Sequence, residues 1–154
     1  ECLTYANKLL CKESMDSMFV TVFYGIYNCR TGVMDYTNAG HNPPSILRRN
    51  RSAAYLPVAS NFVVGVFDDI EFESNTLEFG VGDTLLLYTD GVTEAFNDKR
   101  EQFSEGKLQE VLGALQEDTS AKEVVTQVLH SVRAFSGDYP QSDDITLLSL
   151  QRIR

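Results

Sequence analysis

Two acidic clusters stand at the ends of two apolar runs in this sequence. The run 84–89 leads directly into Asp90, and Asp143 and Asp144 directly precede the run 145–150. A carboxylate at the end of a buried strand borders the core and still reaches solvent, where oxygen ligands can hold a hard cation. This arrangement favours metal-assisted hydrolysis as the chemistry of the chain.

Each cluster taken alone also has an ordinary structural explanation. Asp90 and Gly91 are turn-forming residues that could simply end a strand, and Asp143 and Asp144 could belong to a loop or cap a helix. Two adjacent carboxylates repel each other, and beside a buried strand a cation or a network of donors is needed to offset that repulsion. The joint occurrence of the two clusters therefore favours metal binding.

A polar segment of unusual composition, residues 38–44, lies between two predicted hairpins. Its two prolines force an extended exit, Gly40 permits a tight bend, and Asn38 and Asn42 can bond to backbone groups. His41 could be a metal ligand or a general acid, and the alternative is a turn histidine that bonds to nearby backbone.

Other hydrolase chemistries are excluded by spacing. No cysteine is followed six positions later by arginine, and the patterns D-x-D-x-T, G-x-x-x-x-G-K and G-x-S-x-G do not occur. The remaining candidate is a metal-activated water.

Strands are predicted at both ends of the sequence and helices between the two acidic clusters. β-branched and aromatic residues, apolar runs or loose alternation predict strands at 18–27, 33–38, 45–48, 53–56, 70–79, 84–89 and 145–150. Apolar residues at helical spacing predict helices over 108–115 and 124–135, and a weaker one over 3–11. The sequence from Ser120 to Glu123 is a capping box, and His130 falls on the polar side of the helix that follows it.

The composition is that of one globular domain spanning 1–154, because 154 residues with 43% hydrophobic and 23% charged side chains can bury a core. A net charge of -9 argues against a nucleic-acid partner. The one locally basic stretch, 48–51, is interpreted as a solvated hairpin tip rather than a binding patch.

The cysteines and the hydropathy of the sequence indicate the cellular compartment of the protein. Cys2, Cys11 and Cys29 form no C-x-x-C pair and are odd in number, which favours a reducing compartment, the cytoplasm by default. No apolar stretch reaches the roughly 18 residues of a membrane span, so no membrane contact by this segment is expected.

At the residues that could do chemistry, the sequence resembles the metal-dependent protein serine/threonine phosphatases of the type 2C class, and looks closest to their bacterial sporulation and sigma-regulator branch. The resemblance runs over essentially the whole chain. It is carried, in order, by the motifs at 18–21 (MFVT), 31–32 (TG), 36–44 (YTNAGHNPP), 82–95 (GDTLLLYTDGVTEA) and 141–148 (QSDDITLL).

The resemblance implies an α+β fold, a sandwich of two antiparallel β-sheets flanked by helices, with a two-metal site at one end. It implies that Asp90 and Asp143 are metal ligands. Asp144, which stands where many relatives carry Asn, is given a supporting role together with Gly91, His41 and Asn38.

The implied mechanism uses two Mn²⁺ or Mg²⁺ ions to activate a water that attacks a phosphoserine or phosphothreonine, without a phosphoenzyme and without catalytic residues beyond the metal ligands. The implied substrate is a phosphorylated regulatory protein, an anti-sigma-factor antagonist, and the implied parent protein carries an upstream sensor or receiver domain. Two other readings stay open: a non-catalytic phosphatase-like interaction module, and a hydrolase of small phosphoesters.

One departure from the family pattern concerns the N-terminus. Family members carry an acidic Gly-Asp-x-x-Gly-type motif upstream of the segment corresponding to 3–11, and nothing in this chain matches it. We therefore expect an N-terminally truncated catalytic domain that lacks one or more strands and has little or no activity. An exposed sheet edge would then favour self-association.

Overall fold

The computed structural model describes residues 1–13, 18–50 and 52–154. The described chain forms two compact units. The first unit comprises Glu1–Pro43 with Pro57–Phe79, and the second comprises Pro44–Leu56 with Gly80–Arg154. Arg51, part of the predicted basic hairpin tip, lies outside the described residues.

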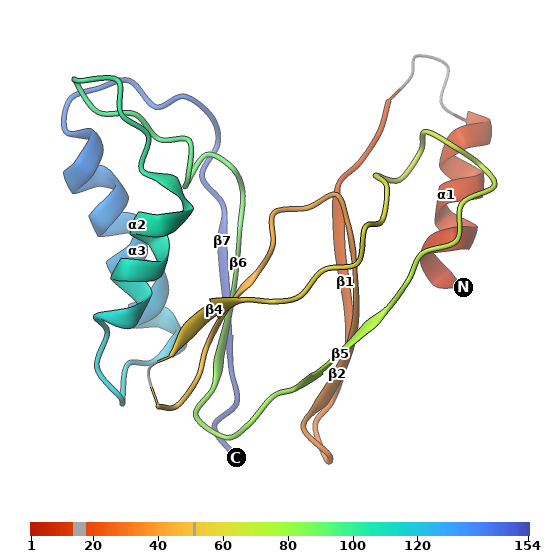
Figure 1. Cartoon of the computed structure of the whole chain (residues 1–154), viewed down its shortest axis with the longest axis horizontal. Helices are drawn as coiled ribbons and strands as arrows, with labels where there is room; N and C mark the ends of the chain where they lie inside the picture. Colours follow the sequence, from red (N-terminus) through yellow and green to blue (C-terminus); the bar gives the residue numbers. More distant parts are fainter. Residues whose placement is uncertain (14–17, 51) are drawn as a thin grey trace. The chain divides into compact units, whose positions relative to one another are not determined.

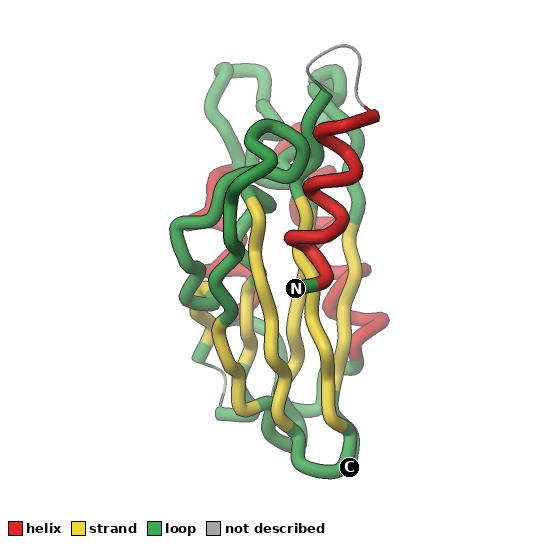
Figure 2. Tube along the Cα trace, turned by 90° about the vertical axis from the view of Figure 1, so that its right-hand side faces the viewer, coloured by secondary structure: helices red, strands yellow, loops and turns green. Residues whose placement is uncertain are grey.

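The first unit contains a three-stranded antiparallel sheet and one helix (Figure 1). The strands, in the spatial order β1-β2-β5, are β1 (Val22–Asn28), β2 (Val33–Ala39) and β5 (Asn75–Glu78). The predicted hairpin of β1 and β2 is confirmed, with Val22 opposite Ala39 and Asn28 opposite Val33. Helix α1 (Cys2–Glu13), also as predicted, begins at the N-terminus (Figure 2).

The second unit contains a four-stranded antiparallel sheet with two helices packed on it (Figure 1). The strands, in the spatial order β4-β3-β6-β7, are β3 (Ser45–Leu47), β4 (Ala53–Tyr55), β6 (Thr84–Tyr88) and β7 (Leu147–Gln151). Helices α2 (Ser104–Gly113) and α3 (Ala121–Ser136) cover the sheet, as the helical spacing predicts. Their apolar faces form a core with the sheet and with the chain after β6, made of Leu86, Tyr88, Val92, Ala95, Phe103, Leu108, Leu112, Val124, Val128 and Val132.

Two predicted strands are shorter than expected. The first begins at Val22 instead of residue 18, and Val20 forms only an isolated bridge with Val64. The strand predicted over 70–79 is limited to Asn75–Glu78. Ahead of it, the side chain of Asn61 bonds to both backbone groups of Glu73, accepting from its N–H at 2.8 Å and donating to its carbonyl at 3.0 Å. The backbone of Glu73 therefore bonds to the side chain of Asn61 and not to a neighbouring strand.

No helix in the part of the chain that the structure describes combines the length and the apolar character needed to cross a membrane.

Helix α3 begins with the predicted capping box. The Ser120 hydroxyl oxygen accepts from the Glu123 N–H at 3.3 Å, and the Glu123 carboxylate accepts from the Ser120 N–H at 2.8 Å. Hydrogen bonds from the side chain and then the backbone of Ser120 lower the pKa of Glu123 below its usual value. His130 on the same helix is exposed, as its position predicts.

The lowered pKa of Glu123 predicts a pH-dependent contribution to stability. A carboxyl group whose pKa is lower in the folded chain stabilises it above the usual pKa of 4.5, and this contribution is lost as the pH falls through the folded value. We expect Glu123→Gln, which removes only the charge, to lower the free energy of unfolding at about pH 7 and to have a smaller effect at about pH 3, where a larger fraction of the glutamate is neutral. Urea unfolding of both proteins at both pH values checks this, and an equal difference at the two would contradict it.

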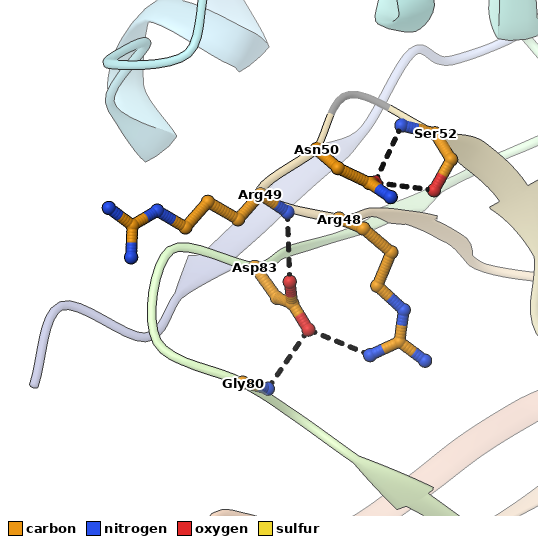
Figure 3. A network of polar contacts seen from close by, with 6 residues as sticks. All are labelled: Arg48, Arg49, Asn50, Ser52, Gly80 and Asp83. Atoms are coloured by element: carbon orange, nitrogen blue, oxygen red, sulfur yellow. Dashed lines mark hydrogen bonds and ion pairs between the residues drawn. The ribbon is translucent and has the colours of Figure 1, made fainter.

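A buried carboxylate, Asp83, anchors the turn before β6 to the hairpin of β3 and β4 (Figure 3). It accepts from the guanidinium of Arg48 at 2.7 Å, from the backbone N–H of Arg49 at 3.0 Å and from the N–H of Gly80 at 2.9 Å. The side chain of Arg49 points away from this network (Figure 3). The prediction of a merely solvated tip is therefore incomplete, because Arg48 forms an ion pair with a carboxylate that is 7% exposed.

Asp83→Ala is expected to lower the free energy of unfolding by about 2–3 kcal/mol, because it leaves two amides and the partly solvated Arg48 without their acceptor. Arg48→Met should cost less, since the carboxylate keeps both amide bonds. Chemical denaturation of the two variants measures the difference, and equal losses would show that the ion pair alone accounts for the stabilisation.

Candidate functional site

The chain leaving β6 is tied to the chain entering β7 through Thr89. The Thr89 N–H donates to the carbonyl of Thr146 at 3.1 Å, and the Thr89 hydroxyl donates to the carbonyl of Asp144 at 2.8 Å. The same hydroxyl accepts from the Thr146 N–H at 2.9 Å. These bonds continue the pairing of β6 with β7 by one residue and place the two acidic clusters at the same end of this strand pair.

The backbone of Gly91 lies directly against the backbone of the second cluster. A Cβ atom added to Gly91 would lie 2.5 Å from the carbonyl oxygen of Asp144 and 2.9 Å from that of Asp143. Both distances are shorter than van der Waals contact, so no other residue fits without a shift of the backbone. Gly91 therefore permits the close approach of the two acidic clusters.

The carboxylates of Asp90 and Asp143 are exposed, and each is oriented by the amide that follows it. One oxygen of Asp90 accepts from the Gly91 N–H at 3.0 Å, and one oxygen of Asp143 accepts from the Asp144 N–H at 2.7 Å. Asp144 is also exposed. The structure thus brings Asp90, Gly91, Asp143 and Asp144 together within the second unit.

The turn after Asp90 is fixed by its backbone and by the core. The Asp90 carbonyl accepts from the Glu94 N–H at 2.8 Å and from the Thr93 hydroxyl at 3.3 Å. Val92 and Ala95 in the same turn are buried in the core of the second unit. A strand end that is anchored in this way can hold an exposed carboxylate in one place.

Asn38 and His41 form a separate turn in the first unit. The amide of Asn38 donates to the carbonyl of His41 at 2.7 Å and accepts from its N–H at 2.8 Å, while Gly40 adopts a positive φ of 76°. The predicted bonding of Asn38 to backbone is confirmed. The backbone of His41 is held by this turn, as the alternative to a ligand role supposes.

The side-chain atoms of the acidic site that could bind a metal ion are all carboxylate oxygens, and oxygen ligands suit Mn²⁺ or Mg²⁺. Among residues 1–13, 18–50 and 52–154, no group of three or more His, Cys, Asp and Glu side chains is arranged to hold a metal ion. Mg²⁺ commonly binds through one or two carboxylates and keeps several waters. Asp90 and Asp143 are two exposed carboxylates, the number of protein ligands that this mode of binding uses.

Two residues of this site were given no role by the sequence patterns. Thr89 joins the two clusters, and Gln141 donates from its side chain to the carbonyl of Asp143 at 2.8 Å. Both lie inside motifs that the sequence analysis singled out, yet only the fold pairs Thr89 with residues more than fifty positions away.

Comparison with known proteins adds a family and relatives. Residues 1–153 match the family described as Stage II sporulation protein E (SpoIIE). Protein IcfG of Synechocystis sp. is 31% identical over 149 residues, which cover 95% of this chain and 23% of IcfG. Phosphoserine phosphatase RsbU of Bacillus subtilis is 28% identical over 152 residues, which cover 99% of this chain and 44% of RsbU. The chain thus spans less than half the length of these relatives.

The fold is shared with a solved structure, the phosphatase domain of the cell fate determinant SpoIIE from Bacillus subtilis, presoaked with Mn. The TM-score is 0.73 at 18% sequence identity, covering 99% of this chain and 64% of that one. The predicted α+β class with two antiparallel sheets and flanking helices is confirmed.

Proposed function

Because the chain belongs to the stage II sporulation protein E (SpoIIE) family, we propose that residues 1–154 act as one catalytic domain of a metal-dependent protein serine/threonine phosphatase. The observation that carries the proposal is the contact of Gly91 with the backbone of Asp143 and Asp144. It joins, at one end of a strand pair, the two acidic motifs on which the resemblance to type 2C phosphatases rests.

Asp90 and Asp143 would hold the metal, with Asp144 and Gly91 in supporting roles, while the supporting role given to Asn38 and His41 of the first unit stays a prediction. The chemistry that bound Mn²⁺ or Mg²⁺ supplies is Lewis-acid catalysis, which makes water a better nucleophile and neutralises charge on a phosphoryl group. Gly91 permits the close approach of the backbone segments that carry the two carboxylates, and Thr89 fixes the ends of the strands beside them. The three exposed carboxylates in a chain of net charge -9 would repel a phosphate dianion without cations.

The proposed substrate is a phosphoserine or phosphothreonine on a bacterial regulatory protein, an anti-sigma-factor antagonist, and the proposed regulator is a sensor or receiver domain upstream in the parent protein. Membership of the SpoIIE family supports this, as does the similarity to RsbU, which is named a phosphoserine phosphatase.

Release of phosphate from a phosphoserine peptide, with Mn²⁺, with Mg²⁺ and with EDTA, tests the proposal. We expect weak turnover at most with either cation, because nothing in residues 1–154 matches the family's Gly-Asp-x-x-Gly-type motif, and none with EDTA. Binding of Mn²⁺ in calorimetry without any turnover would indicate an incomplete phosphatase site, whereas the absence of any Mn²⁺ binding would favour a non-catalytic interaction module. Hydrolysis of nucleotides but not of the phosphopeptide would indicate a small-molecule phosphoesterase.

Self-association through a sheet edge is a further expectation. Strand β7 ends the spatial order of the second sheet, and its Leu148 and Leu150 are 61% and 39% exposed. An edge strand with apolar side chains can pair with another chain. We expect a dimer in light scattering at high protein concentration and less of it for Leu148→Lys, whereas a monomeric mass throughout would rule this out.

A further inference from the structure

A hairpin, residues 96–102, follows the turn of Asp90 in the second unit. Its two arms meet in an isolated bridge. At its base, the N–H of Ser104 donates to the carbonyl of Thr93 at 2.8 Å. The hydroxyl of Thr93 in turn donates to the carbonyl of Asp90 at 3.3 Å. The hairpin is therefore tied to the strand end that carries the first acidic cluster.

The same hairpin contacts the chain that leads into the second acidic cluster. The ring of Phe96 lies against the ring of Tyr139, with 6.3 Å between the two centroids. Tyr139 precedes Asp143 by four positions. Figure 1 shows the hairpin, in green, and the chain after α3, in blue, at the same end of the second unit. The hairpin therefore lies beside both chain segments that carry the candidate metal ligands.

The tip of the hairpin is fixed by one buried side chain, Asn97. Its amide oxygen accepts from the N–H of Lys99 at 3.0 Å and from the N–H of Glu101 at 2.9 Å. Its amide nitrogen donates to the Glu101 carboxylate at 2.8 Å. The backbone carbonyl of Asn97 accepts from the N–H of Arg100 at 3.0 Å. Together these bonds over-determine the backbone of the tip.

The backbone of Arg100 has a positive φ of 61°, a conformation that residues with a Cβ atom rarely adopt. Glycine would fit this position without strain, and yet a long cationic side chain occupies it. Arg100 and its neighbour Lys99 are both exposed, and within the described part of the chain neither forms an ion pair. Backbone strain that neighbouring bonds maintain is concentrated at segments that bind ligands or substrates. The two cations are therefore available to an anion from outside the chain.

The charges around the acidic site show what these two cations can do. Residues 90–104 and 137–146 contain seven carboxylates and only two cations, Lys99 and Arg100. Metal ions would neutralise a phosphoryl group, but carboxylates next to the phosphorylated residue of a substrate would still be repelled by the other acidic side chains. Lys99 and Arg100 would offset this repulsion, and a guanidinium can bind a carboxylate through two parallel hydrogen bonds.

We propose that Lys99 and Arg100 are substrate-binding residues that recognise acidic side chains next to the phosphorylated residue of a protein substrate. The hairpin 96–102 then makes the site prefer acidic phosphorylated segments over neutral ones. The catalytic meaning of this preference rests on the proposed phosphatase function, whereas binding of an acidic segment by the hairpin requires no metal.

The test measures the Kd of synthetic peptides for the whole chain by fluorescence anisotropy with Mn²⁺. The peptides share one sequence around a phosphoserine or a serine, with flanking residues that are either Asp and Glu or the neutral Asn and Gln. We expect the acidic phosphopeptide to bind about tenfold more tightly than the neutral one, and less so as salt is raised. Arg100→Gly should reduce this preference to about twofold or less without changing the Kd of the neutral phosphopeptide. Arg100→Lys, which keeps the charge, should retain most of the preference.

Arg100→Gly should remain folded, because glycine adopts a positive φ readily, and urea unfolding checks this. Lys122→Gln is the matched control, since Lys122 is exposed on α3 in the same unit and its substitution also removes one positive charge. An equal loss of preference in Lys122→Gln would overturn the proposal, because Arg100 would then act only through the net charge. Equal weakening of the acidic and neutral phosphopeptides by Arg100→Gly would also overturn it, since the guanidinium would then bind the phosphoryl group and not the flanking carboxylates.

The peptides that carry serine separate this proposal from the proposed function. If Mn²⁺ changes no phosphopeptide affinity and no phosphate is released, the proposed function fails. Binding of the acidic serine peptide that Arg100→Gly weakens would still support recognition by the hairpin. If the acidic peptides bind no more tightly than the neutral ones, or do not bind at all, the hairpin proposal fails even where Mn²⁺-dependent turnover is found.

Discussion

Asp90→Asn is expected to weaken Mn²⁺ binding by about a hundredfold or more and to remove phosphoserine-peptide turnover with it. The substitution keeps the size of the side chain and its acceptor for the Gly91 N–H, so the strand end should stay folded. It removes the negative charge that an oxygen-ligated cation requires. Titration calorimetry with Mn²⁺ measures the affinity, and phosphate release measures the activity.

Asp118→Asn is the matched control for this substitution. Asp118 is exposed, lies in the same unit between α2 and α3, and loses the same charge. If Asp90 acts only through the net charge of the chain, the two variants should lose equal affinity, and that result would contradict a ligand role. Asp143→Asn should match Asp90→Asn, and the double substitution should add little, because either loss already breaks the pair.

Much of the fold could be predicted because its signals are local. Aromatic and β-branched residues identified the hairpin of β1 and β2, and the apolar spacing identified α2 and α3. The capping box at Ser120 depends on two residues three positions apart, and a pattern that short can be read directly. The two acidic clusters could be predicted to form one site because the strands that they flank needed only to pair with each other.

The errors and omissions have a common physical origin in side chains that bond to distant backbone. The side chain of Asn61 bonds to the backbone of Glu73, which the sequence predicted to lie in a strand. The side chain of Asn7 bonds to the backbone of Gly65 and Phe67. Propensity and periodicity describe a residue and its near neighbours. An asparagine in a helix has the same local signature whether it faces solvent or a buried loop, so its role becomes visible only when the partners are placed.

The two units hold their candidate residues by different means. In the second unit, the carboxylates follow strand ends anchored by an apolar core, with Val92 fully buried two residues after Asp90. In the first unit, the turn of His41 is held by asparagine side chains bonded to backbone. An apolar core is hard to displace, whereas hydrogen bonds to loops can exchange partners. The turn of His41 is therefore expected to open more readily than the strand ends that carry the carboxylates.

Gly91→Ala is expected to disrupt the candidate site without removing any of its donors. The new methyl group would lie 2.5 Å from the carbonyl oxygen of Asp144, so the backbone of one cluster must move away from the other. Overpacking of this kind costs about 1–3 kcal/mol of folding free energy. Since the shift also separates Asp90 from Asp143, we expect Mn²⁺ affinity to fall by about tenfold or more even at temperatures where the variant stays folded.

Gly113→Ala separates the effect of the contact from the effect of adding a methyl group. Gly113 ends helix α2 in the same unit, and a Cβ atom there would meet nothing within 4 Å. Alanine is favoured over glycine in helices by up to about 1 kcal/mol, so this variant should be as stable as the original chain or more so, with unchanged Mn²⁺ affinity. If Gly91→Ala behaved in the same way in urea unfolding and calorimetry, the close approach of the two clusters would have no part in metal binding. A loss confined to Gly91→Ala would show that the site depends on a backbone contact as much as on its carboxylates.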